Sequence, residues 1–179
     1  MRQSRRDIVR LVGAAGVALG AAGAHSARTA AQGATPTSDA ASLTKQTISL
    51  ETAMALIDAA HVKAAEIGVP MAVAVVDEGG LLKAFGRMDG VNSAATVDIV
   101  QMKAYSSAAF RTPTHQIAEG VMENGPRAAS LSNIPRFTLL GGGFPIRDGD
   151  VVVGGLGIGG GSADQDVEVG EAALAAVFG

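Results

Sequence analysis

The chain has 179 residues, of which 47% are hydrophobic, and this is enough for one compact domain with an ordinary core. A net charge of −3 and an aromatic content of 3%, with no tryptophan, argue against a nucleic-acid partner, which would need a basic surface or stacking side chains. The sequence has no cysteine, which excludes thiolate catalysis, zinc–thiolate sites and iron–sulfur clusters.

Residues 1–31 are predicted to be a twin-arginine signal peptide. The pair Arg5-Arg6 precedes an apolar stretch at 11–24, and small residues suited to cleavage follow at 29–31. The apolar stretch is too short for a stable membrane anchor. We therefore expect a periplasmic or secreted protein, exported by the twin-arginine route.

Residues 32–47 are rich in Ser, Thr and Ala and are predicted to be a disordered tether. Residues 48–179 form the predicted folded domain. Its helices and strands are predicted from helix-capping residues, from glycine and proline residues that end an element, and from hydrophobic periodicity. In chain order these are a helix at 49–67, strands at 71–77 and 81–87, helices at 91–110 and 112–123, strands at 136–140, 144–147 and 151–158, and a helix at 164–178. Hairpin-linked strands with helices grouped between them indicate an antiparallel α+β fold, in the order α-β-β-α-α-β-β-β-α.

The segment 155–160, Gly-Leu-Gly-Ile-Gly-Gly, fits the dinucleotide-binding pattern G-x-G-x-x-G. That pattern requires a second parallel strand after the helix, and only one helix of chain remains here, so a dinucleotide site is rejected. Two interpretations stay open. The helix start could hold an anionic group, or the glycines could simply let strand and helix pack closely.

Four stretches, in order, are VAVVDEGGLLKAFGRMDG, KAYSSAAF with PT close behind, GGGFPI, and GDVVVGGLGIGGGSADQD. Together they resemble the GlcG/HbpS family, also called the haem-degrading or DUF336 family. The resemblance implies a profilin-like, five-stranded antiparallel sheet flanked by helices, usually in an oligomer. It also implies a small-molecule ligand, most often haem, with corrinoid-linked and small-organic-acid enzymes among the relatives. We accordingly expect a homo-oligomer.

A haem site needs an axial donor, and two histidines are the candidates. His115 follows Thr114 at a position that the resemblance places beside the ligand pocket, and Thr114 is itself a possible oxygen donor. His61 lies on the apolar face of the first helix. Each histidine has a structural alternative: His61 as a hydrogen-bonded core residue, and His115 as a solvent-exposed first-turn residue.

Haem propionates also need cations, and Arg87 and Lys103 are the candidates. Arg87 could instead form a strand-end ion pair with Asp89. Lys103 could be a surface lysine, although the resemblance places it at the pocket.

Three functions follow from these residues. The first is a periplasmic protein that binds haem or a related tetrapyrrole. The second is an enzyme acting on a small carboxylated compound, with Arg87 and Lys103 holding the carboxylate and Asp89 or His115 moving a proton. The third is an oligomeric accessory or sensor module. Whether the chain is an enzyme is left open by its sequence.

Overall fold

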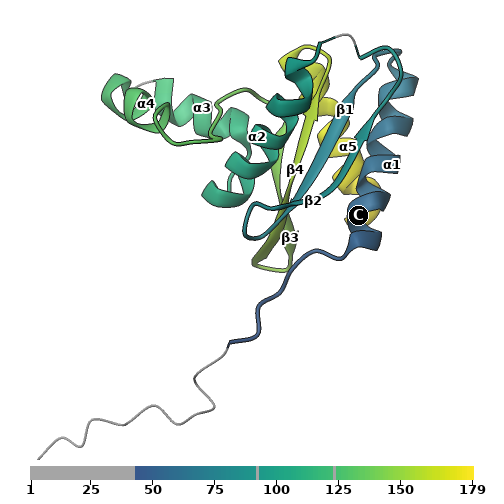
Figure 1. The fold of residues 1–179 in the computed structure, drawn as a ribbon, viewed down its shortest axis with the longest axis horizontal. Helices are drawn as coiled ribbons and strands as arrows, with labels where there is room; N and C mark the ends of the chain where they lie inside the picture. Colours follow the sequence, from purple (N-terminus) through teal and green to yellow (C-terminus); the bar gives the residue numbers. More distant parts are fainter. Residues whose placement is uncertain (1–42, 92, 123) are drawn as a thin grey trace, which may run out of the picture. The chain divides into compact units, whose positions relative to one another are not determined.

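The computed structural model describes residues 43–91, 93–122 and 124–179 (Figure 1). The predicted signal peptide and the first part of the predicted tether lie outside these residues. The elements are α1 (Leu50–Glu66), β1 (Ala72–Asp77), β2 (Leu82–Arg87), α2 (Ala95–Phe110), α3 (Thr114–Met122), α4 (Gly125–Leu131), β3 (Gly143–Asp148), β4 (Val151–Gly159) and α5 (Ala163–Phe178). None of the described helices is long and apolar enough to cross a membrane.

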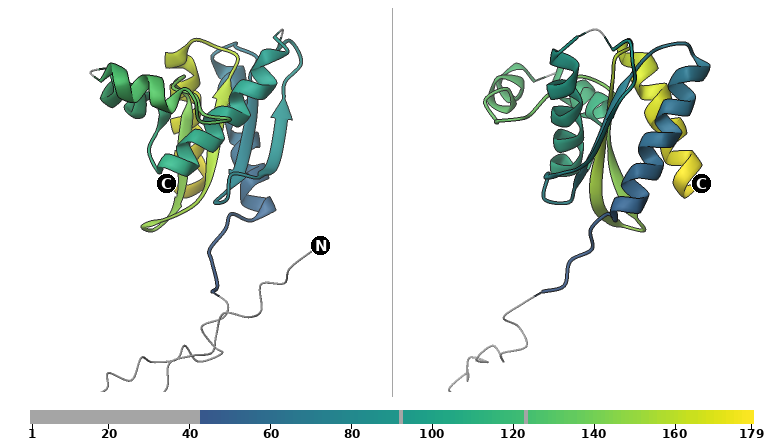
Figure 2. Two further views of the ribbon diagram at one scale, coloured as in Figure 1. Left: turned by 60° about the vertical axis from the view of Figure 1, so that its left-hand side comes forward. Right: turned by 45° about the vertical axis from the view of Figure 1, so that its right-hand side comes forward.

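The strands form one antiparallel sheet in the order β2-β1-β4-β3. Helices α1 and α5 cover one face, and α2 covers the other, as the right-hand view of Figure 2 shows. The predicted α+β class and the antiparallel sheet with helices on both sides are confirmed. The predicted fifth strand is wrong, because the sheet that the described residues form has four strands.

The segment 136–140, predicted as a strand, packs instead against helices. Arg136 adopts a left-handed φ of 65°, which interrupts an extended strand. Phe137 is buried in a small cluster with residues of α3 and α4. The backbone N–H of Thr138 donates to the Ser106 hydroxyl of α2 at 2.9 Å, so it makes no strand pairing. Local apolar contacts therefore override the strand propensity of this segment.

Helix α4 is absent from the predicted elements, because the residues Asn124-Gly125-Pro126 that follow the helix predicted at 112–123 are typical of a helix end. In the structure the Asn124 side chain accepts a hydrogen bond from the Arg127 N–H at 3.2 Å and caps a new helix. Pro126 lies in the first turn of α4, where a missing N–H costs nothing. The same three residues that stop one helix thus begin the next.

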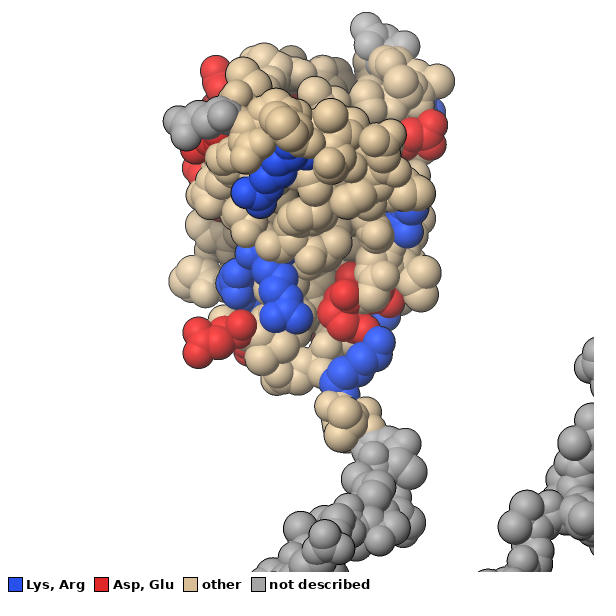
Figure 3. Space-filling view, turned by 90° about the vertical axis from the view of Figure 1, so that its left-hand side faces the viewer, with Lys and Arg blue, Asp and Glu red and all other residues tan. Residues whose placement is uncertain are grey.

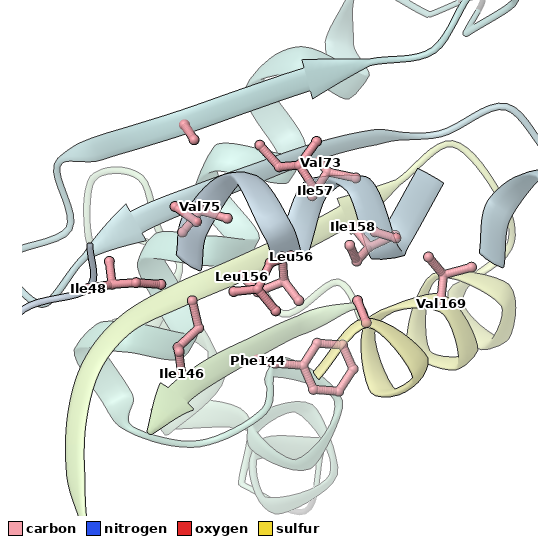
Figure 4. Close-up of a cluster of buried hydrophobic side chains, with 14 of the residues drawn as sticks. Ile48, Leu56, Ile57, Val73, Val75, Phe144, Ile146, Leu156, Ile158 and Val169 are labelled. Carbon is pink, nitrogen blue, oxygen red and sulfur yellow. The ribbon is translucent and has the colours of Figure 1, made fainter. Parts of the chain in front are cut away.

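The main core lies between the sheet and the pair α1 and α5. Large aliphatic side chains fill it, with Phe144 as its aromatic member (Figure 4). Its labelled members are Ile48, Leu56, Ile57, Val73, Val75, Phe144, Ile146, Leu156, Ile158 and Val169. Hydrophobic burial at this face supplies most of the driving force for folding.

The opposite face of β4 carries glycines, and α2 lies directly on them. A Cβ atom added to Gly157 would lie 2.0 Å from the Val100 carbonyl oxygen, and one added to Gly155 would lie 2.2 Å from that of Ala104. Two strand residues and one helical turn advance by similar distances, so alternate glycines face successive turns of α2. This confirms the close-packing interpretation of the glycine-rich stretch.

The chain before α1 runs along the sheet. The Ile48 N–H donates to the Val153 carbonyl at 3.0 Å, and Lys45 forms an ion pair with Glu78 at the β1–β2 turn. Hydrogen bonds from Lys45 and Thr47 lower the pKa of Glu78 from 4.5 to about 2.

Candidate functional site

A glycine bend that leads into β3 brings three of the predicted site residues together. The Gly143 N–H donates to the Thr114 hydroxyl at 2.9 Å, and a Cβ on Gly143 would lie 2.5 Å from the Lys103 carbonyl oxygen. A Cβ on Gly141 would lie 3.6 Å from the His115 Cβ. Lys103, Thr114 and His115 therefore surround one backbone segment, although they belong to two helices.

Lys103 is buried, with 3% of its surface exposed, and it pairs with a residue that the sequence did not single out as a site residue. Its Nζ donates to the Asp166 carboxylate at 2.6 Å and to the Ile158 carbonyl at 2.7 Å. The Gly161 N–H donates to the second Asp166 oxygen at 3.1 Å. Burial raises the pKa of Asp166, and the Lys103 ammonium opposes that rise.

The sequence signal for this pair is weak. Lys103 stands one turn before Ser107 and one turn after Ile99 on a helix whose other inward positions are small or apolar. Asp166 stands in the first turn of its helix, where acidic residues are common without any partner. A separation of 63 residues hides the contact from any local pattern.

The Lys103–Asp166 pair lies at the end of the sheet, where glycines, which have no side chain, leave room for it. A Cβ on Gly142 would be 3.3 Å from the Lys103 Nζ, and one on Gly159 would be 3.8 Å from it. A cavity of about 270 Å³ adjoins the pair. Its lining residues are Ser93, Thr96, Ile99, Lys103, Leu140, Gly141, Gly159, Gly160, Gly161, Ala163 and Asp166.

His115 is half-buried beside the aromatic residue of β3. The His115 and Phe144 rings are tilted by 60°, with centroids 5.9 Å apart. Of its two ring nitrogens, Nδ1 is enclosed and has no hydrogen-bond partner among the described residues. Thr114, in contrast, is fully buried and its hydroxyl already binds the Gly143 N–H. Thr114 is therefore not available as an oxygen donor to a ligand on the surface.

His61 lies at the other edge of the sheet. A Cβ on Gly86 would be 2.8 Å from the His61 Cε1, so the ring rests directly on the backbone of β2. Its Nε2 is enclosed and lacks a partner within the described part of the chain. Because β2 and β3 are opposite edge strands, the structure does not bring His61 and His115 to one site. No cluster of three or more metal-binding side chains occurs in the described ranges.

Arg87 is exposed at the end of β2 and is also distant from His115. It pairs in register with Ala72 of β1, which pairs with Gly159 of β4, so these three share a row across the α2 face. The row places Arg87 about 10 Å from Gly159, two strand spacings away. The alternative interpretation, an ion pair with Asp89, is not formed in the structure as described.

The face on which α3 and α4 lie shows isolated basic and acidic groups within a mainly uncharged surface (Figure 3). This face presents no continuous basic field of the kind that a phosphate backbone requires.

The fold and the site define a class of small α+β domain, with an antiparallel sheet between helices and a buried lysine–aspartate pair at one end. A family model described as haem-degrading protein HbpS-like matches residues 48–175. The chain belongs to this HbpS-like family.

Known relatives agree in sequence and in fold. An uncharacterized 15.0 kDa protein of Citrobacter freundii is 36% identical over 129 residues, which is 72% of this chain and 90% of that protein. A double mutant of HbpS from Streptomyces reticuli is similar in structure, with a TM-score of 0.72, 25% identity and coverage of 93% of this chain and 100% of the other. A PduOC complex with haem has a TM-score of 0.66 at 27% identity, over 74% and 96% of the two chains.

Proposed function

We propose that this protein binds haem or a related tetrapyrrole, with His115 as the axial donor. The observation that carries the proposal is the half-buried imidazole of His115, fixed against the Phe144 ring in a family that includes a haem complex. A histidine held in this way can supply a ring nitrogen to iron without a large loss of side-chain freedom.

The residues around His115 fit part of what haem requires. The bend at Gly141 lies against His115, and Leu140, which is 52% exposed, precedes it. Leu140 offers apolar surface for a macrocycle, whereas Phe144 is buried behind His115 as part of the core. Bound haem would supply a redox-active iron, while His115 would hold the iron and Phe144 would orient the imidazole.

Arg87 and Lys103 do not fit the propionate role that the sequence suggests. Arg87 lies on the opposite edge strand and on the α2 face, whereas Phe144 belongs to the core on the other face. The Lys103 ammonium is bound to Asp166, and Lys103 lines a cavity that His115 does not line. A cation for a propionate beside His115 would therefore come from another residue or from a second copy of the chain.

A haemin titration of the purified protein tests the proposal. We expect a Soret band, and His115→Ala should shift it and weaken binding at least about tenfold, or 1.4 kcal/mol. His61→Ala is the matched control, because the His61 ring rests against Gly86 and should leave the band unchanged. An unchanged spectrum in His115→Ala, or a shift only in His61→Ala, would refute the assignment of the donor.

The same titration separates the alternatives. Absence of haem uptake, together with turnover of a small carboxylated compound, would favour the enzyme. Absence of both, with a partner-dependent phenotype, would favour the accessory or sensor module. We also propose export by the twin-arginine route, and replacement of Arg5 and Arg6 by lysine should then leave the precursor in the cytoplasm.

A further inference from the structure

The cavity beside the Lys103–Asp166 pair lies between the first turns of two helices. Thr96 and Ile99 belong to the start of α2, and Ala163 to the start of α5. Its volume of about 270 Å³ lies just below the range of about 300–1,000 Å³ found for sites that hold drug-sized ligands. The cavity therefore suits a molecule much smaller than haem, and His115 is not among its lining residues.

Lys103 brings an unused hydrogen-bond donor to this cavity. An ammonium group has three N–H donors, and within the described structure two of them bind the Asp166 carboxylate and the Ile158 carbonyl. Gly142 and Gly159 lie next to the Nζ and carry no side chain that could cover it. The third donor is thus left for a ligand, on a side chain that is itself almost completely buried.

The start of α5 brings a further donor to the same cavity. A capping box closes this end, in which the Ser162 hydroxyl accepts from the Gln165 N–H. The N–H group of Ala163, which lines the cavity, has no partner among the described residues, as expected for the first turn of a helix. It lies at the positive end of the helix dipole, which favours an anionic oxygen.

We propose that this cavity binds a small monocarboxylate. One carboxylate oxygen accepts from the third Lys103 N–H, and the other accepts from the free amide of Ala163 at the start of α5. Ile99 and Leu140 also line the cavity and provide apolar contact for a short hydrocarbon end. The Asp166 charge offsets that of Lys103, so the affinity is low, with a Kd of about 1 mM.

Sodium butyrate is a suitable probe, followed through the amide resonances of Gly160, Gly161 and Ala163 in the purified full chain. We expect shifts that saturate with butyrate and do not occur with butyramide or sodium chloride. Ala163→Phe narrows the cavity and should abolish the shifts at Gly160 and Gly161. Ala176→Phe is the matched control, since it makes the same change at an exposed position near the far end of α5 and should leave binding intact.

Asp166→Asn tests the electrostatic part of the proposal. It removes the opposing negative charge, so butyrate should bind about tenfold more tightly even if the protein is less stable. If the pair only holds α2 to α5, Asp166→Asn should lower the stability of the protein without tightening the binding of butyrate. The proposal is overturned if butyrate gives no saturating shifts at about 10 mM, or if Ala163→Phe binds it as the wild type does. The haemin titration does not depend on this result, because its Soret band is read through His115, which does not line the cavity, although Leu140 borders both sites.

Discussion

At the scale of single residues, the Lys103–Asp166 pair is where burial and charge conflict most strongly. Both side chains are nearly enclosed, with 4% and 5% of their surfaces exposed. Removing two charges from water costs as much as their attraction returns, unless further hydrogen bonds complete the arrangement. The Ile158 carbonyl and the Gly161 N–H provide such bonds here.

Lys103→Met should destabilise the fold by about 3–5 kcal/mol, because it leaves the Asp166 carboxylate buried without its partner. Adding Asp166→Asn removes that charge and should recover at least half of the loss. Urea unfolding of the two single variants and the double variant measures the coupling. A double variant no more stable than Lys103→Met would contradict this account.

The Lys45–Glu78 ion pair predicts a specific acid dependence. The pKa of Glu78 in the folded chain is about 2, below its ordinary value of 4.5. The ionised carboxylate therefore stabilises the fold above about pH 4.5, and this contribution is lost as the pH falls towards 2. Unfolding midpoints measured from pH 6 to 2 should decline less in Glu78→Gln than in the wild type. Glu119→Gln, at an exposed position, should decline as the wild type does.

At the scale of elements, the contact between α2 and β4 depends on the absence of side chains. Gly157 allows the Val100 carbonyl to approach the strand backbone, and this oxygen belongs to the helix itself and cannot rotate away. Any side chain at this position would push α2 away from the sheet and would open the layer that the small residues of β1 and α2 fill.

Gly157→Ala should consequently destabilise the protein by at least about 1–3 kcal/mol, the usual cost of overpacking. Gly120→Ala in α3 is the comparison, because an added Cβ there meets nothing within 4 Å in the described structure. That change should stabilise the protein by about 0.5–1 kcal/mol, since alanine is the better helix former. Thermal unfolding of both variants checks the opposite signs. Equal effects would contradict the close contact between Gly157 and α2 as the source of the loss.

The elements predicted correctly are those whose sequence pattern and tertiary role agree. The first helix has its Ser49 cap, and β1 is a continuous apolar run between two covered faces. The predictions failed between 124 and 140, where Asn124 caps a helix instead of ending one and Phe137 packs against neighbouring helices. Signals that both stop and start a helix cannot be resolved from local sequence alone.

At the scale of the whole molecule, sheet order decides which predicted site residues can meet. Helical spacing placed His61 on the buried face of α1, and the structure agrees that it faces inward. Spacing within one helix carries no information about strand order, which separates His61 and Arg87 from His115. The haem hypothesis grouped all five candidate residues, but the structure groups only Lys103, Thr114 and His115.

Self-association is the prediction at this scale. The edge strand β2 exposes Leu82 and Phe85, at 50% and 36%, and its outer backbone edge has no neighbouring strand in the described sheet. An exposed apolar edge of this kind favours pairing with another chain, so we expect a homo-oligomer. Light scattering at micromolar concentration should give a multiple of the chain mass. A mass of one chain would count against the prediction.

The glycine face of β4 also has a consequence for the gene that encodes it. Every amino acid that a single-base change can introduce at a glycine codon carries a Cβ atom. At Gly155 and Gly157 each such atom would meet the backbone of α2. No missense mutation at these two codons should therefore be mild. Leu or Val codons of the main core differ, because a side chain of similar size can be substituted there. Random mutagenesis with selection for folded protein should deplete substitutions at these two codons more strongly than at the larger core residues.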